Sequence, residues 1–320
     1  MKRYRIRNWS EYNKSLIQRG SITFWIEEKA LKNWFSSSHT CMAGRPEIYS
    51  DEAILTMLVL RELYHLPLRA LEGFVQSLFA KMGINLSVPC YTQISRRAKS
   101  LHKRLKVLTH SKKARHLIFD STGLKVHGEG EWKVRTHGKS KRRTWRKFHI
   151  GIDADTQDIV CCELTSNSQG DARVAEGMLK GLPGKVKSVR GDGAYDAVRF
   201  REIVDRKGGT CIVPPPRDAT YKGVMGEVNE AWIRSRDDTV ATICGLGGGD
   251  LGRKLWKILS GYYKRSLVES TMFRVKKLFG DKLKARLMDT QKSEVLCKCI
   301  IINKMNSLGM PRFEWVEEAA

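Results

Sequence analysis

The 320-residue sequence lacks the patterns that mark several large classes of protein. No apolar run approaches the roughly 18 residues needed to cross a bilayer, and no apolar stretch follows the basic N-terminus, so we expect neither a membrane span nor a secretory signal. The eight cysteines include no C-x-x-C pair, and the eight histidines include no H-x-x-x-H pair with a nearby carboxylate. These absences argue against a disulfide framework and a zinc site, and they favour a reduced, cytoplasmic protein.

Acidic residues are also scarce, because 34 Asp and Glu face 58 Lys and Arg, which gives a net charge of +24. The hydrophobic content of 41% is enough to fill a core, so the chain is not a disordered basic tail. The excess lies in residues 94–150 (18 basic, 3 acidic, +15) and residues 253–286 (11 basic, 2 acidic, +9). This clustering predicts a nucleic-acid partner, whereas a basic enzyme without such a partner is the alternative.

The N-terminal part of the chain has the periodicity of helices. Ser50 is a candidate N-cap for a helix that ends near Tyr64, Pro67 starts a second helix, and residues 91–99 form a third with a polar and basic beginning. Three short helices ending in a basic one resemble a helix-turn-helix DNA-binding unit, in which Arg96 and Arg97 would contact phosphates. A plain helical bundle with one basic face is the alternative.

From about residue 116 the pattern changes to strands. We predict strands at 116–126, 148–153, 159–165, 186–190 and 210–213, with helices at 171–182 and 196–207 between them. A polar, glycine-rich stretch over 217–252 has little period, and a single long helix is predicted over 252–279. This order predicts an α/β domain with a mixed sheet, not a doubly wound nucleotide-binding fold.

Three acidic residues stand out by position. Asp120 lies inside an apolar strand, where an acid is costly to bury unless it binds a metal or a partner charge. Asp192 follows a strand and is flanked by glycines that allow close approach to a ligand, and Glu269 lies within the predicted long helix. Taken singly, they could be a salt-bridged core acid, a turn former and a helical ion-pair partner. Carboxylates gathered at a sheet edge bind Mg²⁺ or Mn²⁺, and two such ions support phosphodiester chemistry.

The spacing around Glu269 places a polar stripe on that helix. Tyr262, Arg265, Glu269 and Lys276 follow one another at intervals of three, four and seven residues, so they share one side. A neighbouring apolar stripe is predicted to pack on the sheet and consists of Val268, Met272, Val275 and Phe279.

A basic loop is predicted between the first two strands. Residues 133–147 hold eight Lys and Arg and no acid. We predict DNA-backbone contacts there rather than a merely solvated loop, and the candidate residues are Lys141, Arg142, Arg143, Arg146 and Lys147. Residues 247–254 are similar to a P-loop but lack its Gly-Lys-Ser/Thr ending.

The pattern Tyr262-x2-Arg265-x3-Glu269-x6-Lys276 resembles the signature of bacterial insertion-sequence DDE transposases. Asp120 in a first strand and Asp192 in a GDGAYD segment resemble the other two acids of that family. Further similarity to the insertion-sequence-five family lies in residues 136–150, in Arg19-Gly20-Ser21 with Trp25, and in Gly44-Arg45-Pro46-x2-Tyr49-Ser50. The resemblance covers nearly the whole chain.

The resemblance implies a domain order. It gives an N-terminal helical segment (1–45), a helical DNA-binding region (46–110), a ribonuclease-H-like catalytic domain (111–280) and a C-terminal helical tail (281–320). A loop-rich insertion at about 214–252 interrupts the catalytic domain, and it is short beside the β insertions of some relatives.

The resemblance also implies a chemistry. Asp120, Asp192 and Glu269 would ligate two Mg²⁺ ions, with Mn²⁺ able to substitute, and Tyr262, Arg265 and Lys276 would hold the transposon end. Water would free a 3′-hydroxyl at the inverted repeat, and this hydroxyl would then attack double-stranded target DNA. A homodimer or larger assembly would pair the ends, in the bacterial cytoplasm at the nucleoid. The alternatives are a non-catalytic, transposase-derived repressor and a junction-cleaving nuclease.

Overall fold

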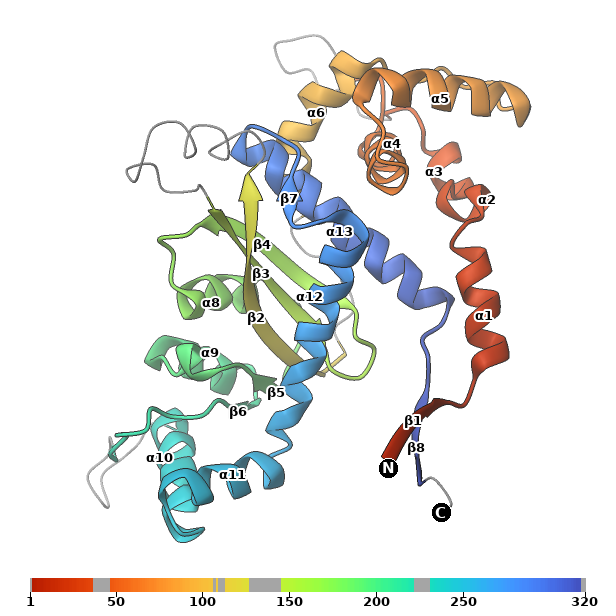
Figure 1. Cartoon of the computed structure of the whole chain (residues 1–320). Helices are drawn as coiled ribbons and strands as arrows, with labels where there is room; N and C mark the ends of the chain where they lie inside the picture. The colour runs from red at the N-terminus through yellow and green to blue at the C-terminus, as the bar shows by residue number, and fades with distance from the viewer. Residues whose placement is uncertain are drawn as a thin grey trace, which may run out of the picture. The chain divides into compact units, whose positions relative to one another are not determined.

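A computed structural model describes residues 2–36, 47–105, 108, 113–126, 145–221 and 231–317 (Figure 1). The chain divides into two compact units, one formed by residues 1–104 with 287–320 and the other by residues 105–286. Within the described ranges, no helix is both long and apolar enough to span a membrane.

The first unit is mainly helical. Its elements are β1 (Lys2–Ile6), α1 (Trp9–Gln18), α2 (Ile22–Trp25), α3 (Glu28–Lys32), α4 (Asp51–Leu63), α5 (Leu68–Lys81), α6 (Tyr91–Arg104), α13 (Met288–Leu308) and β8 (Phe313–Glu317). The three helices predicted over residues 51–99 are therefore confirmed. Ser50 caps α4, because its side chain accepts a hydrogen bond from the Ala53 N–H at 3.0 Å.

Helix α13 joins the chain's C-terminal part to this unit. It packs against α4 and α6, and most of its middle residues are buried. The Ser293 hydroxyl donates to the Ala98 carbonyl at 2.6 Å, which fastens α13 to α6. Strand β8 then pairs antiparallel with β1, so the two ends of the described chain share one two-stranded sheet.

The second unit contains the larger sheet. Its elements are β2 (Arg115–Val126), β3 (Trp145–Asp153), β4 (Ile159–Ser166), α8 (Asp171–Gly181), β5 (Val186–Arg190), η1 (Gly193–Tyr195), α9 (Val198–Arg206), β6 (Thr210–Ile212), α10 (Ala231–Gly245), α11 (Gly249–Leu259), η2 (Tyr262–Arg265), α12 (Ser266–Phe279) and β7 (Lys282–Leu283). All five predicted strands are confirmed, as are the helices predicted before and after β5.

The sheet is mixed, as predicted. Its strands lie in the order β4-β3-β2-β5-β6, and β7 pairs with the end of β2. Strands β2, β3 and β4 are antiparallel, whereas β5 and β6 run parallel to β2. The central strand β2 therefore borders both halves of the sheet.

Alternation along β2 gives the sheet two different faces. Leu117 and Phe119 point into a buried cluster with residues of α8 and α9. Asp120 and Thr122 point the other way, toward α12, which crosses this side of the sheet (Figure 1). The apolar stripe predicted on α12 is confirmed, since Val268, Met272, Val275 and Phe279 are all buried.

Two predictions about the segment after β6 were wrong. The single helix expected over 252–279 is broken into α11, η2 and α12, because Gly261 adopts a left-handed conformation with φ of 64°. The Arg190 Nε donates to the Gly261 carbonyl at 3.1 Å and holds this bend against the end of β5. The glycine-rich stretch over 217–252 is not only loop, because residues 231–245 form α10.

Candidate active site

Two of the predicted acids lie on neighbouring strands. In the parallel register of β2 and β5, Ile118 pairs with Arg190. Asp120 and Asp192 each follow two residues later, so the chain carries them to the same level of the sheet. Asp192 stands where β5 ends, which is the usual place for functional groups beside parallel strands.

Asp120 is a partly buried carboxyl surrounded by other charges. Its Oδ1 accepts a hydrogen bond from the Ser121 N–H at 2.8 Å, and its Oδ2 lies 3.2 Å from Arg265 Nη1. Burial raises the pKa of Asp120 above its ordinary value, and the negative charges of Asp192 and Glu269 raise it further, whereas the two hydrogen-bond donors oppose the rise. Asp192 and Glu269 are therefore both close enough to repel the charge of Asp120.

Asp192 is held by the tight turn that follows it. Its Oδ1 accepts a hydrogen bond from the Ala194 N–H at 2.9 Å, so Asp192 caps η1. Gly191 permits this turn, because a Cβ at that position would lie 2.7 Å from the ring of Tyr195. The glycine predicted to allow close approach of a ligand thus first allows the buried Tyr195 to pack beneath the turn.

Glu269 reaches the acids from the first turn of α12. Its side chain is about half exposed, and its Oε1 pairs with Arg265 Nη2. One guanidinium thus bridges Asp120 and Glu269. The predicted stripe is partly reproduced despite the broken helix, because η2 delivers Tyr262 and Arg265 to the side of α12 that carries Glu269.

Lys276 and Tyr262 flank this group. Lys276 Nζ donates to the Thr122 hydroxyl at 2.6 Å, two residues beyond Asp120 on β2. The ring of Tyr262 packs near Trp256, and burial raises the pKa of its phenol. Both residues lie beside the acids, where a bound phosphate chain would need cations and a rigid aromatic surface.

The donor atoms suit a divalent cation, although the arrangement is not yet a metal site. Carboxylate oxygens are the ligands that Mg²⁺ and Mn²⁺ prefer. Among the residues that the structure describes, no group of three or more His, Cys, Asp or Glu side chains is arranged to hold an ion. In this structure the guanidinium of Arg265 lies between Asp120 and Glu269 and supplies the positive charge there.

A second polar group lies on the opposite face of the sheet. Lys147 Nζ donates to Asp171 Oδ1 at 3.0 Å, and His149 Nε2 lies 2.9 Å from the Thr165 hydroxyl. His149 Nδ1 is 3.4 Å from Asp171, and burial lowers the pKa of His149 to about 4. Lys147, a predicted DNA contact, is therefore engaged with Asp171 at the start of α8.

The other predicted basic contacts fall in different places. Arg146 lies on β3, one residue before Lys147. Lys141, Arg142 and Arg143 lie outside the described residues.

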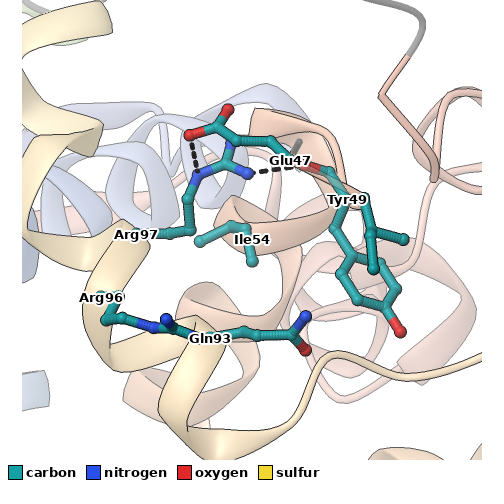
Figure 2. A pocket seen from close by; sticks show the side chains of 7 residues that line it. Glu47, Tyr49, Ile54, Gln93, Arg96 and Arg97 are labelled. Carbon is teal, nitrogen blue, oxygen red and sulfur yellow. Dashed lines mark hydrogen bonds and ion pairs between the residues drawn. The ribbon is translucent and has the colours of Figure 1, made fainter. Parts of the chain in front are cut away.

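In the first unit, Arg96 and Arg97 line a cavity of about 220 Å³ between α4 and α6 (Figure 2). Arg97 is tied to the protein itself, since its guanidinium donates to the Tyr49 carbonyl at 2.7 Å and pairs with Asp51 at 2.6 Å and with Glu47 at 3.2 Å. Arg96 is exposed on the same helix. The two neighbouring arginines thus differ in how much freedom they have to bind a ligand.

Arg190 is a site residue that the sequence prediction missed. Besides holding the Gly261 bend, its Nη1 donates to the Ser188 hydroxyl at 2.8 Å, and the side chain is buried. Its only sequence signal is an arginine at the end of an otherwise apolar strand, directly before Gly191-Asp192. This buried arginine joins the end of β5, directly before Asp192, to the Gly261 bend that precedes Arg265.

Two protein-family models, both described as transposase DDE domain, match the chain over residues 17–129 and 111–304. Among solved structures, a piggyBac transposase synaptic complex with hairpin DNA aligns at 10% identity over 91% of this chain and 75% of that chain, with a TM-score of 0.41. The Drosophila P element transposase strand transfer complex aligns at 11% identity over 88% and 84%, with a TM-score of 0.30. A simian T-cell lymphotropic virus intasome aligns at 13% identity over 69% and 68%, with a TM-score of 0.23. The second family model spans more than half of the chain.

Proposed function

The chain belongs to the family of transposase DDE domains, and on that premise we propose that it cuts DNA at the inverted repeats of its own insertion sequence and joins the freed ends to target DNA. We assign it within this family to the bacterial insertion-sequence-five group, on the motifs around Glu269 and in residues 136–150. The observation that carries the proposal is that Arg265 contacts both Asp120 and Glu269, while Asp192 follows the strand that runs parallel beside the strand of Asp120.

The sheet supports a ribonuclease-H-like assignment for the second unit. Three antiparallel strands are followed by two strands parallel to the first, and the first strand lies at the centre. Asp120 then sits on the central strand and Asp192 at the end of its parallel neighbour. Glu269 completes the group from a helix that packs across that face.

Asp120, Asp192 and Glu269 are the residues that would hold two Mg²⁺ ions, or Mn²⁺ in their place. Such ions lower the pKa of a bound water and stabilise charge on the attacking and leaving oxygens of a phosphodiester. The Ser121 and Ala194 N–H groups would orient the carboxylates of Asp120 and Asp192, and partial burial would shield Asp120 from water. Arg265 would leave Asp120 and Glu269 and pair with a DNA phosphate instead, which keeps the local charge balanced.

DNA binding would involve both units. Tyr262, Arg265 and Lys276 border the acids and would hold the end that is cut. Helix α6 would recognise the inverted repeat as part of a helix-turn-helix-like region, with the exposed Arg96 on a phosphate. Arg97 supports that region from inside through Glu47 and Asp51. Two copies or more would pair two ends at the bacterial nucleoid.

A cleavage assay tests this function. Wild-type protein is incubated with Mg²⁺ and a labelled duplex that carries the element's inverted repeat, and nicked and joined products are separated on a gel. We expect products with wild type and none with Asp192→Ala. Asp250→Asn is the matched control, because Asp250 is an exposed acid of α11 outside the acid group, and it should cut like wild type.

The same assay separates the alternatives. Binding of the repeat without any cleavage by wild type would indicate a repressor. Cleavage of four-way junctions regardless of sequence would indicate a junction nuclease. Equal activity of wild type and Asp192→Ala would show that the acid group is not the catalytic centre.

A further inference from the structure

The insertion between β6 and α12 is tied to the turn that carries Asp192. Arg236 of helix α10 lies in a buried position, with its Nε 3.4 Å from Asp196 Oδ2. Its Nη1 donates to the Thr220 carbonyl at 2.9 Å, so the same side chain also holds the beginning of the insertion. The side chain of Asp196 is 3% exposed and accepts a second, shorter hydrogen bond from Arg201 Nε at 2.6 Å.

Asp196 stands at the far end of the turn that Asp192 begins. The Tyr195 N–H donates to the Asp192 carbonyl at 3.1 Å, and the Asp196 N–H donates to the Gly193 carbonyl at 3.1 Å. These bonds leave the turn little freedom between the two aspartates. A contact that holds the Asp196 carboxylate in place therefore also restrains the backbone of the turn, and this backbone sets the orientation of the Asp192 side chain.

The charges show that Arg236 is not needed to neutralise Asp196. Arg201 belongs to α9, lies in the core and already gives this carboxylate one full positive charge. Arg236 adds a second guanidinium from an element outside the sheet. Arg236 also lies 3.6 Å from Asp237 Oδ1 on its own helix, so the two buried arginines face two carboxylates. What Arg236 adds at Asp196 is therefore a link from α10 to the turn that Asp192 begins.

The far end of the insertion is fastened independently. Arg253 of α11 donates to the Pro215 carbonyl at 2.8 Å and also to the Pro216 carbonyl, just after β6. Helix α11 leads directly to the Gly261 bend and to η2, which carries Arg265. The insertion thus lies between the two segments that supply Asp192 and Glu269.

We propose that Arg236 is a positioning residue, through which the insertion fixes the orientation of Asp192 for metal binding. This role depends on the proposed function, because it concerns the same acid group. Residues that orient metal ligands change metal affinity by about 10- to 100-fold when they are removed. Arg236 contacts neither metal nor DNA in this role and acts only through Asp196.

The test measures metal binding without DNA and without turnover. Mn²⁺ is titrated into the full-length protein, and the bound fraction is followed by electron paramagnetic resonance. Arg236→Met is expected to weaken Mn²⁺ binding about 10-fold, while Asp196 and Arg201 remain a balanced pair. Arg217→Met is the matched control, because it removes the same charge from an exposed pair of the insertion and should bind like wild type.

Two further variants make the result decisive. Arg236→Lys restores a charge opposite Asp196 and should recover part of the affinity. If Arg236→Met does not fold, Arg236→Gln takes its place in the same comparison. Wild-type Mn²⁺ affinity in a folded Arg236 variant without the charge would overturn the positioning role.

An Asp192→Asn variant separates this failure from failure of the proposed function. If Asp192→Asn loses Mn²⁺ binding while Arg236→Met retains it, the acid group binds metal and only the role of Arg236 is wrong. If wild type binds no Mn²⁺ that depends on Asp192, the metal site itself is wrong, and the positioning role is overturned with it.

Discussion

The two faces of the central sheet both carry buried or partly buried acids, but they balance them differently. On the face toward α8, Asp171 is matched by Lys147 and contacted by His149. On the face toward α12, Asp120 is close enough to Asp192 and Glu269 to be repelled by both, and Arg265 is the cation that contacts two of them. A balanced group contributes to stability, whereas a group with surplus negative charge is ready to bind further cations.

The largest expected effect on cleavage comes from neutralising Asp120, on the face of the sheet toward α12. Asp120→Asn removes one metal ligand and should lower the rate of inverted-repeat cleavage by at least about 100-fold. Because burial and then the neighbouring negative charges disfavour the charged form of Asp120, we expect the metal-free variant to melt at or above the wild-type temperature. Gel assays and thermal unfolding check the two parts, and a clear loss of metal-free stability would contradict the repulsion.

Neutralising Asp171 should lower the stability of the protein and leave its cleavage activity nearly unchanged, which is the opposite of the effect expected at Asp120. Asp171→Asn weakens the contacts with Lys147 and His149, and we expect it to lower the free energy of unfolding by about 1–2 kcal/mol. Cleavage should remain close to wild type when measured well below the melting temperature. Asp205→Asn, an exposed acid on α9, is the control for loss of a carboxylate charge. Loss of cleavage by a folded Asp171→Asn variant would place Asp171 in the catalytic group.

We expect the stability of the protein to depend on pH through His149, which lies on the same face of the sheet as Lys147 and contacts Asp171. Its pKa is lowered from 6.5 to about 4 by burial, so the unfolded chain binds this proton more readily than the folded one. Its contribution to stability is therefore complete above about pH 6.5 and is lost as the pH falls toward 4, by up to about 3 kcal/mol. Urea unfolding of wild type and His149→Gln across this range measures the difference. A parallel pH dependence in the two proteins would contradict the lowered pKa.

The smallest expected effect concerns the competition between Arg265 and metal. Arg265→Gln frees Asp120 and Glu269, so Mn²⁺ should bind the DNA-free protein more tightly, by up to about fivefold for a partly exposed ion pair. Lys264→Gln removes the same charge from an exposed neighbouring position and is the control. Weaker binding by Arg265→Gln than by the control would mean that Arg265 supports the metal site rather than occupying it.

Much of the fold could be predicted from the sequence, because its signals are local. Alternation and turn residues located β5 at Val186–Arg190 without error, and Ser50 with two following acids located the start of α4. The apolar stripe of α12 also follows from periodicity alone, which is why it survived the error in the length of that helix.

The errors arose where distant contacts decide the conformation. Gly261 is compatible with a continuous helix, and the bend there accepts a hydrogen bond from Arg190 of the distant strand β5. The pairing of β1 with β8 joins segments more than 300 residues apart, which no local pattern reveals. The spacing predicted that Arg265 would lie beside Glu269, but its contact with Asp120 required the folded sheet.

The measurement that tests the central claim most directly is the melting temperature as a function of Mg²⁺ concentration. A ligand that binds only the folded state raises the melting temperature as its concentration increases. We predict that wild type and Asp171→Asn gain stability in parallel as Mg²⁺ is added, while Asp120→Asn and Asp192→Asn gain much less. An equal gain in all four proteins would contradict the assignment of Asp120, Asp192 and Glu269 as the metal-binding group.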